Sequence, residues 1–287
     1  MSYQIITDSC CDFTDAMCAE LGIVSTPLTV SYNGETHHNF SEETAIQAFY
    51  NELRSGVMAT TSAVNPEGWA QAIRPVLEAG EDALVIAFTS GMSATYQSAV
   101  IAAEELREEY PQRKISVVDS LCAALGQGLL IWYACKKRDE GLSLEELTAW
   151  VEENKLHICH WVTVDDLTHL KRGGRISATS AIVGTMLNIK PIIHVNDEGR
   201  LVNVAKVRGR KTAITYLADK LGELGGQYEN ETCFLVHGDC EADAKVLSQM
   251  IQEKYGIKHV HIGYLGPVIG AHTGPGVLAL FFMGEHR

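Results

Sequence analysis

The sequence predicts an α/β protein built from two α/β domains, with a parallel sheet in the N-terminal domain and a mixed sheet in the C-terminal domain. The chain has 287 residues, which suits about two domains of ~100–200 residues each. In the first half, short apolar runs alternate with helical segments, as they do in parallel sheets. Beyond residue 157 hairpins replace this alternation. We therefore expect one domain at residues 1–156 and a second at residues 157–287.

The first domain has the pattern of strand–helix repeats. Residues 83–88 form a continuous apolar run, which is typical of a buried parallel strand. Asn33-Gly34 is a strong hairpin signal, and Ser143 with Glu146 forms the capping pattern that begins a helix. The predicted strands are residues 3–7, 27–32, 35–38, 83–88 and 115–118, and the predicted helices are residues 12–21, 41–55, 65–80, 93–110, 121–138 and 143–156.

The second domain mixes hairpins with helices. Residues 196–199 form a turn between two strands, and residues 259–284 contain no Asp, Glu, Lys or Arg. We expect this uncharged segment to form a strand, a functional loop and a strand, because its glycines and prolines do not suit a lipid-facing helix. The predicted strands are residues 158–164, 189–195, 201–207, 232–236, 258–262 and 277–283, and the predicted helices are residues 165–171, 177–187, 210–224 and 241–255.

Composition and charge exclude several classes of protein. Apolar residues make up 46% of the chain, as in ordinary globular proteins, so a disordered chain is not expected. The 36 acidic and 23 basic residues give a formal net charge of −13. Such a charge repels nucleic acid. The N-terminus has no basic stretch and reaches Asp8 quickly, so we expect neither a signal peptide nor stable membrane anchoring.

The eight cysteines are scattered and form no C-x-x-C motif, so we expect reduced thiols in the core. Together with the missing export signal, this predicts a cytoplasmic protein. His157, Cys159 and His160 lie close in sequence, but no second ligand pair stands at the spacing of a zinc finger. We therefore expect no metal site.

Residues 89–96 follow a buried strand and begin a long helix. Ligands of open α/β sheets bind at the carboxyl ends of the strands, and the free N–H groups and dipole of a helix start favour an anion. Gly91 would permit close approach of the backbone, and Ser93 offers a hydroxyl group. Two interpretations stay open: Ser93 binds an anion, or it is only an N-cap.

Two further segments carry uncharged hydrogen-bond donors. Thr60-Thr61-Ser62 lies between two predicted helices, either as an ordinary loop or as part of an anion site. Residues 266–276 place several glycines and prolines around His272, which is either a buried structural histidine or a ligand residue. The hydroxyl, imidazole and backbone N–H groups of these segments would hold a carboxylate or phosphate without a salt bridge.

Common nucleotide and hydrolase motifs are absent. The sequence contains neither a Walker A motif nor G-x-G-x-x-G, so ATP or NAD binding is not predicted. Ser93 lacks the second glycine of a nucleophile elbow. Two basic segments, residues 171–177 and 206–211, stand out on an acidic chain and favour contact with a phosphate group or a partner.

With these segments identified, the chain resembles the DegV family of bacterial lipid-binding proteins over nearly its whole length. Ala63-Val64 and Ala94 depart from residues that the family often has, but neither departure removes a ligating group. The motifs that carry the resemblance, in the family's order, are Thr7-Asp8-Ser9, Thr61-Ser62, Ser90-Gly91-Met92-Ser93 with Thr95-Tyr96-Gln97-Ser98-Ala99, Val118-Asp119-Ser120, Gly173-Gly174-Arg175-Ile176-Ser177, Lys190-Pro191-Ile192 and residues 266–276.

The resemblance implies a carrier and not an enzyme. Such a protein holds one long-chain fatty acid in a buried tunnel between its domains and presents the carboxylate to a separate fatty acid kinase, which forms the acyl phosphate. Carried over by motif, Thr61, Ser62, Ser93 and His272 would bind the carboxylate, and Arg172 would contact the kinase. The resemblance implies no cofactor besides the fatty acid as ligand.

Two alternatives stay open at the level of sequence. An enzyme, either a hydrolase or a transferase, would act on a small acyl or phosphoryl substrate with Ser93 and His272 as catalytic groups. An interaction module would hold lipid only as a structural filler. A fatty acid that co-purifies would favour the carrier or the module, whereas turnover of an acyl ester without a partner would favour the enzyme.

Overall fold

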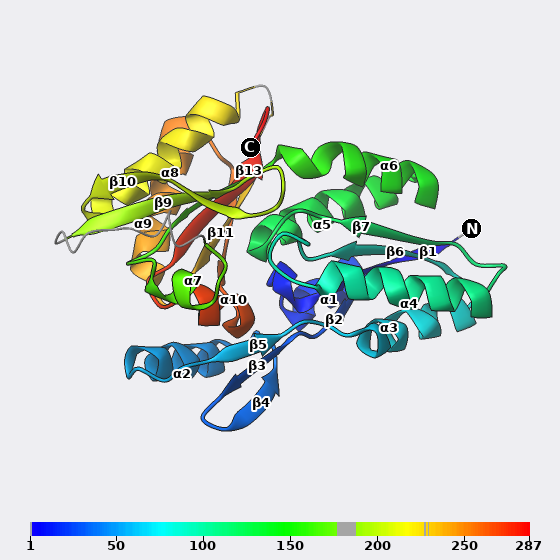
Figure 1. Cartoon of the computed structure of the whole chain (residues 1–287). Helices are drawn as coiled ribbons and strands as arrows, with labels where there is room; N and C mark the ends of the chain where they lie inside the picture. The colour runs from blue at the N-terminus through cyan, green and yellow to red at the C-terminus, as the bar shows by residue number, and fades with distance from the viewer. Residues whose placement is uncertain (1, 177–187, 227, 229) are drawn as a thin grey trace.

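The computed structural model of the protein describes residues 2–176, 188–226, 228 and 230–287. The strands of this part form a four-stranded, a six-stranded and a small three-stranded sheet. Figure 1 shows the two larger sheets beside each other, with the small sheet below them. The first sheet is parallel and the six-stranded sheet is mixed. The predicted α/β fold class is therefore confirmed, including the difference between the two sheets.

The parallel sheet is covered by helices on both faces. Because side chains alternate along a strand, Ile6 and Val85 pack in one apolar cluster and Ile5 and Leu84 in another. The strands, in spatial order, are β2 (Val24–Thr26), β1 (Tyr3–Asp8), β6 (Asp82–Ala87) and β7 (Ile115–Asp119). Helices α3 (Pro66–Glu78) and α4 (Thr95–Glu109) cover one face, and α5 (Ala124–Asp139) and α6 (Leu144–Asn154) cover the other.

The small sheet carries one strand that the sequence did not predict. The hairpin at Asn33-Gly34 is confirmed, but residues 60–62 pair with the hairpin and do not form a loop. Thr61 lies opposite Val30 in this pairing. In spatial order the strands are β4 (Glu35–His38), β3 (Thr29–Tyr32) and β5 (Thr60–Ser62). In the chain, α2 (Glu43–Arg54) connects β4 to β5, and α1 (Asp15–Leu21) precedes β2.

The six-stranded sheet packs against helices on both sides. Its outer face contacts α8 (Arg210–Leu224) and α9 (Glu241–Tyr255), and its inner face contacts α5. One pair of neighbouring strands at the edge of this sheet is parallel and the other pairs are antiparallel, so the sheet is mixed. In spatial order the strands are β10 (Leu201–Arg208), β9 (Ile189–Val195), β8 (Ile158–Thr163), β13 (Leu278–Met283), β11 (Thr232–His237) and β12 (His259–Tyr264).

The uncharged segment at 259–284 contains a helix where a loop was predicted. Between β12 and β13, α10 (Pro267–Thr273) begins with proline at its first position and ends at Gly274, whose φ is 78°. The expectation of a loop was wrong because proline and glycine here mark the two ends of a helix. In the described part of the chain, no helix is both long and apolar enough to cross a bilayer.

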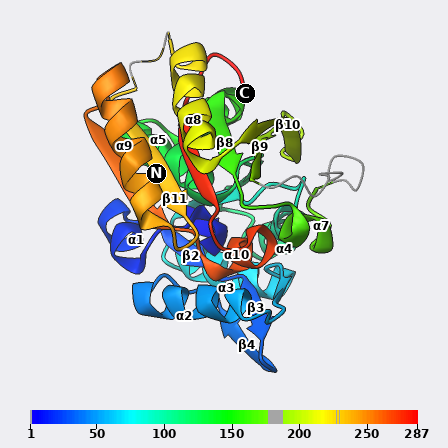
Figure 2. The ribbon, with the colours of Figure 1, turned by 90° about the vertical axis from the view of Figure 1, so that its left-hand side faces the viewer.

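The position of α10 joins the parts of the fold. It contacts α2, β3, β5 and α7 (Thr168–Arg172), as Figure 2 shows near the centre of the molecule. Five predicted helix starts lie two or three residues too early: these helices begin at Asp15, Glu43, Thr95, Ala124 and Thr168. The helix predicted at 177–187 lies outside the described residues.

The predicted domain boundary at residue 157 falls between the sheets. Every strand of the parallel and small sheets precedes it, and every strand of the six-stranded sheet follows it. One apolar cluster nevertheless contains residues from both parts, such as Leu129 of α5 with Phe234 and Phe281. The division into two domains stays a prediction.

Candidate functional site

A cavity of 220 Å³ lies where α10 meets β5, the loop before α4 and the segment after α7. Its wall contains Thr61 and Ser62 of β5, Ser93 of that loop and His272 of α10. The structure thus brings together the four residues singled out for a carboxylate. They come from parts of the chain more than 200 residues apart, and the contact of β5 with α10 makes this possible.

Thr61 and His272 form a direct hydrogen bond. The Thr61 Oγ1 atom lies 2.7 Å from Nε2 of His272. If Nε2 carries the proton, the ring donates to the Thr61 oxygen and leaves the hydroxyl hydrogen free to donate to a ligand. In that tautomer the histidine orients the threonine toward the cavity.

His272 is held as a neutral ring. Burial, reinforced by the positive charges of Arg175 and Arg172, lowers the pKa of His272 to about 4. Its other nitrogen, Nδ1, lies against Gly173, where an added Cβ would come within 2.3 Å. Only glycine fits at this position without displacing the ring.

Ser93 lies one residue before the N-cap of α4, which is Ala94, so the interpretation of Ser93 as the N-cap was wrong. Its Oγ accepts a hydrogen bond from the Thr95 N–H at 3.2 Å and lies 2.8 Å from Thr95 Oγ1. It therefore binds the first N–H group of α4 and also lines the cavity. These contacts fix the direction of the hydroxyl group next to the helix start, where the N–H groups favour negative charge.

The loop that carries Ser93 is fixed by its neighbours. Asp119 at the end of β7 accepts hydrogen bonds through Oδ1 from the Ser90 and Leu121 N–H groups, both at 3.1 Å. At Gly91 an added Cβ would lie 2.5 Å from the Gly199 carbonyl oxygen. The close approach that Gly91 permits is therefore to the hairpin turn 196–199, and this was not foreseen from the sequence.

Arg175 is a cavity residue that the sequence analysis did not single out for the carboxylate. Its Nε donates to the Met92 carbonyl at 3.2 Å and its Nη1 to the Gly173 carbonyl at 2.6 Å. It thereby joins the Ser93 loop to the glycine pair, and it lines the cavity. The three segments singled out from the sequence offer uncharged donors, and Arg175 adds a positive charge to the same wall. The basic segment 171–177, predicted to contact a phosphate group or a partner, was the available signal.

Arg172 lies apart from the cavity. It is exposed, and its Nη2 is 3.0 Å from Nδ1 of His169. In the second basic segment, Arg210 pairs with Asp243 at 2.8 Å and so joins α8 to α9. A partner contact by Arg172 stays a prediction.

An apolar cavity of 60 Å³ adjoins the polar one. Phe88, Met92 and Leu201 lie in the walls of both, and the residues that line the second cavity are apolar except for His160 and Thr273. Its floor is the inner face of the six-stranded sheet, with residues from β8, β9, β11 and β13. At its inner end His160 is buried and neutral, because burial lowers its pKa and its Nε2 accepts from the Ala123 N–H at 3.1 Å.

The Thr7-Asp8-Ser9 motif supports this wall from behind. Asp8 accepts hydrogen bonds from the Phe88 N–H at 2.7 Å and the Cys10 N–H at 3.0 Å, and burial raises the pKa of Asp8 to about 6. It holds the end of β1 to the end of β6. Phe88 then contributes to both cavities, so this motif acts on the site through the backbone.

The hydrogen bonds do not form a nucleophile–base pair. His272 bonds to Thr61 and Ser93 bonds to Thr95, and no hydrogen bond joins Ser93 to His272 in the described part of the chain. A serine nucleophile requires a base within hydrogen-bond reach. Among the described residues, no group of His, Cys, Asp and Glu is arranged to hold a metal ion.

Comparisons with known proteins show the family and the fold of the chain. A family model described as "Uncharacterised protein, DegV family" matches residues 2–285. A DegV domain-containing protein of Clostridium perfringens is 45% identical over 286 residues, which cover 99% of this chain and 98% of the relative. A structure of a DegV family protein from Thermus thermophilus, described by its fatty acid binding, has a TM-score of 0.88 at 30% identity and covers 99% of this chain and 100% of its own. A DegV lipid-binding protein from Thermotoga maritima has a TM-score of 0.86 at 28% identity, with 100% of both chains covered.

Proposed function

Because the chain belongs to the DegV family, we propose that it binds one long-chain fatty acid, with the carboxylate in the polar cavity and the acyl chain in the apolar one. The observation that carries the proposal is the junction of these two cavities. An amphiphile with one small anionic head and one long apolar tail matches a polar cavity that continues into an apolar one.

The head group would be held mainly by neutral donors. The Thr61 hydroxyl, oriented by His272, and the Ser93 hydroxyl both border the polar cavity. Arg175 adds a positive charge in the same wall, which favours the ionised carboxylate. Ser62 is exposed at the rim, where it can bond to the second oxygen or to water.

The tail would supply most of the affinity. Burying ~14 methylene groups at ~0.8 kcal/mol each gives a gross ~11 kcal/mol, which ordering and association costs reduce substantially. Hydrogen bonds to the charged head contribute ~1–3 kcal/mol. We therefore assign affinity to the apolar cavity and orientation to Thr61, Ser93 and His272.

Accommodating the tail requires side chains to move. One water-sized group occupies ~30 Å³ in a liquid, so ~14 methylene groups need several times the 60 Å³ of the apolar cavity. Met92 and Leu201 stand between the two cavities. Met92 has an unbranched, flexible side chain, so its rotation is the simplest way to open the passage.

We further propose that the bound carboxylate is presented to a separate fatty acid kinase in the cytoplasm and that the protein has no catalytic activity of its own. The guanidinium of Arg172 is exposed and outside the wall of the polar cavity, and its charge acts on His272, so it suits a contact with such a partner. The polar cavity is lined from both proposed domains, residues 1–156 and 157–287. The ligand would thus lie between them.

A double variant tests the head-group assignment. Thr61→Val with Ser93→Ala keeps the shape of the site but removes both hydroxyls. Fatty-acid affinity, measured by displacement of a fluorescent analogue, should fall several-fold to a hundredfold, at ~1–3 kcal/mol for unmade bonds to a charged group. Unchanged affinity in a correctly folded double variant would place the carboxylate elsewhere.

A further inference from the structure

The two edges of the six-stranded sheet differ in how they are protected. β10 forms one edge, where its register shifts between Asn203 and Ala205 and the strand carries Lys206 and Arg208. Bulges and charged side chains are the usual means by which edge strands avoid pairing with other chains. β12 forms the other edge, pairs with β11 in continuous register and contains no Lys, Arg, Asp, Glu or Pro. It lacks each of these protections.

The backbone of β12 offers free groups for pairing. The His259 N–H donates to the Glu231 carbonyl at 2.8 Å, and the Leu265 N–H donates to the His237 carbonyl at 2.9 Å. Backbone groups alternate in direction along a strand, so Val260, Ile262 and Tyr264 turn their N–H and C=O groups away from β11. Within the described residues no hydrogen bond to these backbone groups is found.

A groove follows this edge along its whole length. Two hollows, of 570 and 740 Å³, both border His261 and together have all six residues of β12 in their walls. Because successive side chains point to opposite faces of a sheet, consecutive residues can line one groove only where it runs along the strand edge. Helix α1 contributes to the walls of both hollows. Asp15 and Cys18 line the first hollow, and Met17 and Leu21 line the second.

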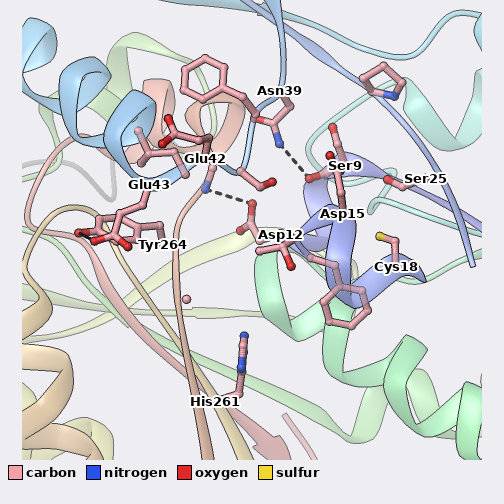
Figure 3. A pocket seen from close by; sticks show the side chains of 18 of the residues that line it. Ser9, Asp12, Asp15, Cys18, Ser25, Asn39, Glu42, Glu43, His261 and Tyr264 are labelled. Atoms are coloured by element: carbon pink, nitrogen blue, oxygen red, sulfur yellow. Dashed lines mark hydrogen bonds between the residues drawn. The ribbon is translucent and has the colours of Figure 1, made fainter. Parts of the chain in front are cut away.

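The groove is acidic at the end near Tyr264. Asp12, Asp15, Glu42 and Glu43 line that hollow, and no Lys or Arg does. Figure 3 shows Glu42 and Glu43 on the side of Tyr264 and Asp12 with Asp15 across from them. The Oδ2 atom of Asp12 is buried without a hydrogen-bond partner in the described structure. The other hollow carries both signs of charge, so the acidic bias belongs to one end.

We propose that the groove binds an extended segment of a partner protein, which adds a strand beside β12 and places a Lys or Arg side chain among the carboxylates near Tyr264. Peptides that add to a sheet edge gain affinity from the main chain and specificity from alternate side chains. Opposite charge favours a basic residue at the acidic end. The groove shares no wall residue with either cavity of the proposed fatty-acid site, so this surface is independent of lipid binding.

A display library of peptides randomised at eight positions tests the proposal. Peptides selected on the full-length protein should alternate β-branched or aromatic residues and carry Lys or Arg toward one end. They should bind Ile262→Pro at least about tenfold more weakly, because proline removes an outward N–H and obstructs the edge. The pairing of β12 with β11 does not use that N–H, so the sheet itself is retained.

Matched variants separate the edge from side-chain packing. Ile262→Ala removes the apolar side chain but keeps the N–H group, and it should bind the selected peptides nearly as well as the wild type. Asp15→Lys should abolish the preference for basic peptides. Amide exchange at Val260, Ile262 and Tyr264 should slow when a selected peptide is added, which reports on the edge even if the proline variant does not fold.

Three outcomes would overturn the proposal. One is a failure to enrich any extended peptide on the wild type, and another is selection of peptides that bind Ile262→Pro equally well. The third is a concentration-dependent dimer of the wild type that Ile262→Pro abolishes, since the edge would then belong to a second copy of this chain.

Discussion

Replacing Gly173 by alanine tests whether the position of the His272 ring controls the carboxylate site. Gly173 follows α7 with φ −72° and ψ −10°, which alanine adopts without strain. The new Cβ would lie 2.3 Å from Nδ1 of His272, whereas ordinary contact begins at 3.4 Å. The ring, or the end of α7, must therefore shift by 3.4 − 2.3 = 1.1 Å in total.

Such a shift is large enough to break the bond that orients Thr61. The distance from Thr61 Oγ1 to His272 Nε2 is 2.7 Å, and hydrogen bonds weaken steeply beyond their normal range. Loss of this arrangement should cost ~1–3 kcal/mol of fatty-acid binding, which is about five- to 150-fold in Kd. The free energy of unfolding should change less, because no apolar core is disturbed.

The assay is displacement of a fluorescent fatty acid, with thermal unfolding recorded in parallel. Gly174→Ala is the control: its Cβ meets open space, but its φ of 71° makes alanine strained, so it should lower stability without weakening binding. Adding Gly173→Ala to His272→Ala should have no further effect, because the obstructed ring is gone. Wild-type affinity in Gly173→Ala, or an equal loss in Gly174→Ala, would refute the reasoning.

Two further predictions concern the partner and the protonation of the site. Arg172→Glu should abolish phosphorylation of the bound fatty acid by the kinase through charge repulsion and leave lipid retention unchanged; if this variant purifies empty, Arg172 is a ligand residue. Burial lowers the pKa of His272 to about 4 in the folded protein, whereas a histidine of the unfolded chain titrates near ~6.5. Between these pH values, the histidine therefore binds more protons in the unfolded chain than in the folded protein. Ligand-free wild type should therefore lose free energy of unfolding relative to His272→Gln as pH falls from ~6.5 to about 4, by at most ~3 kcal/mol, and no further below. Urea unfolding of both proteins at each pH measures this difference. Asp8, whose buried carboxyl has a raised pKa of about 6, contributes in the opposite direction, but it contributes equally to both proteins and cancels. Parallel pH profiles would show that His272 is not the neutral buried ring described.

The sequence predicted those elements whose signals are local. The apolar run at 83–88, the turn at Asn33-Gly34 and the capping pattern at Ser143 each act within a few residues, and each corresponds to β6, the β3–β4 hairpin or α6 in the structure. The helix starts were predicted less accurately, because the position of a cap depends on backbone angles that residue types alone leave open. Asp12, for example, adopts a left-handed conformation before α1.

Features that depend on tertiary contact were missed. β5 is only three residues long and exists because Thr61 pairs with Val30, 31 positions earlier in the chain. Gly91 was interpreted as making room for a ligand, but it makes room for the turn at Gly199. Arg175 lines the polar cavity because two carbonyl groups from different loops hold it there. Apart from the Gly173 carbonyl, two residues before Arg175, these partners lie far from their residues in sequence.

Native mass spectrometry of the protein, purified from a bacterial cytosol without added lipid, tests the central claim most directly. The account predicts one non-covalent adduct per chain with the mass of a long-chain fatty acid, removed by organic extraction and depleted in Thr61→Val with Ser93→Ala. It also predicts no hydrolysis of acyl esters by the purified protein alone. A chain that carries no lipid and takes up none on addition, or a covalent acyl group on Ser93, would contradict it.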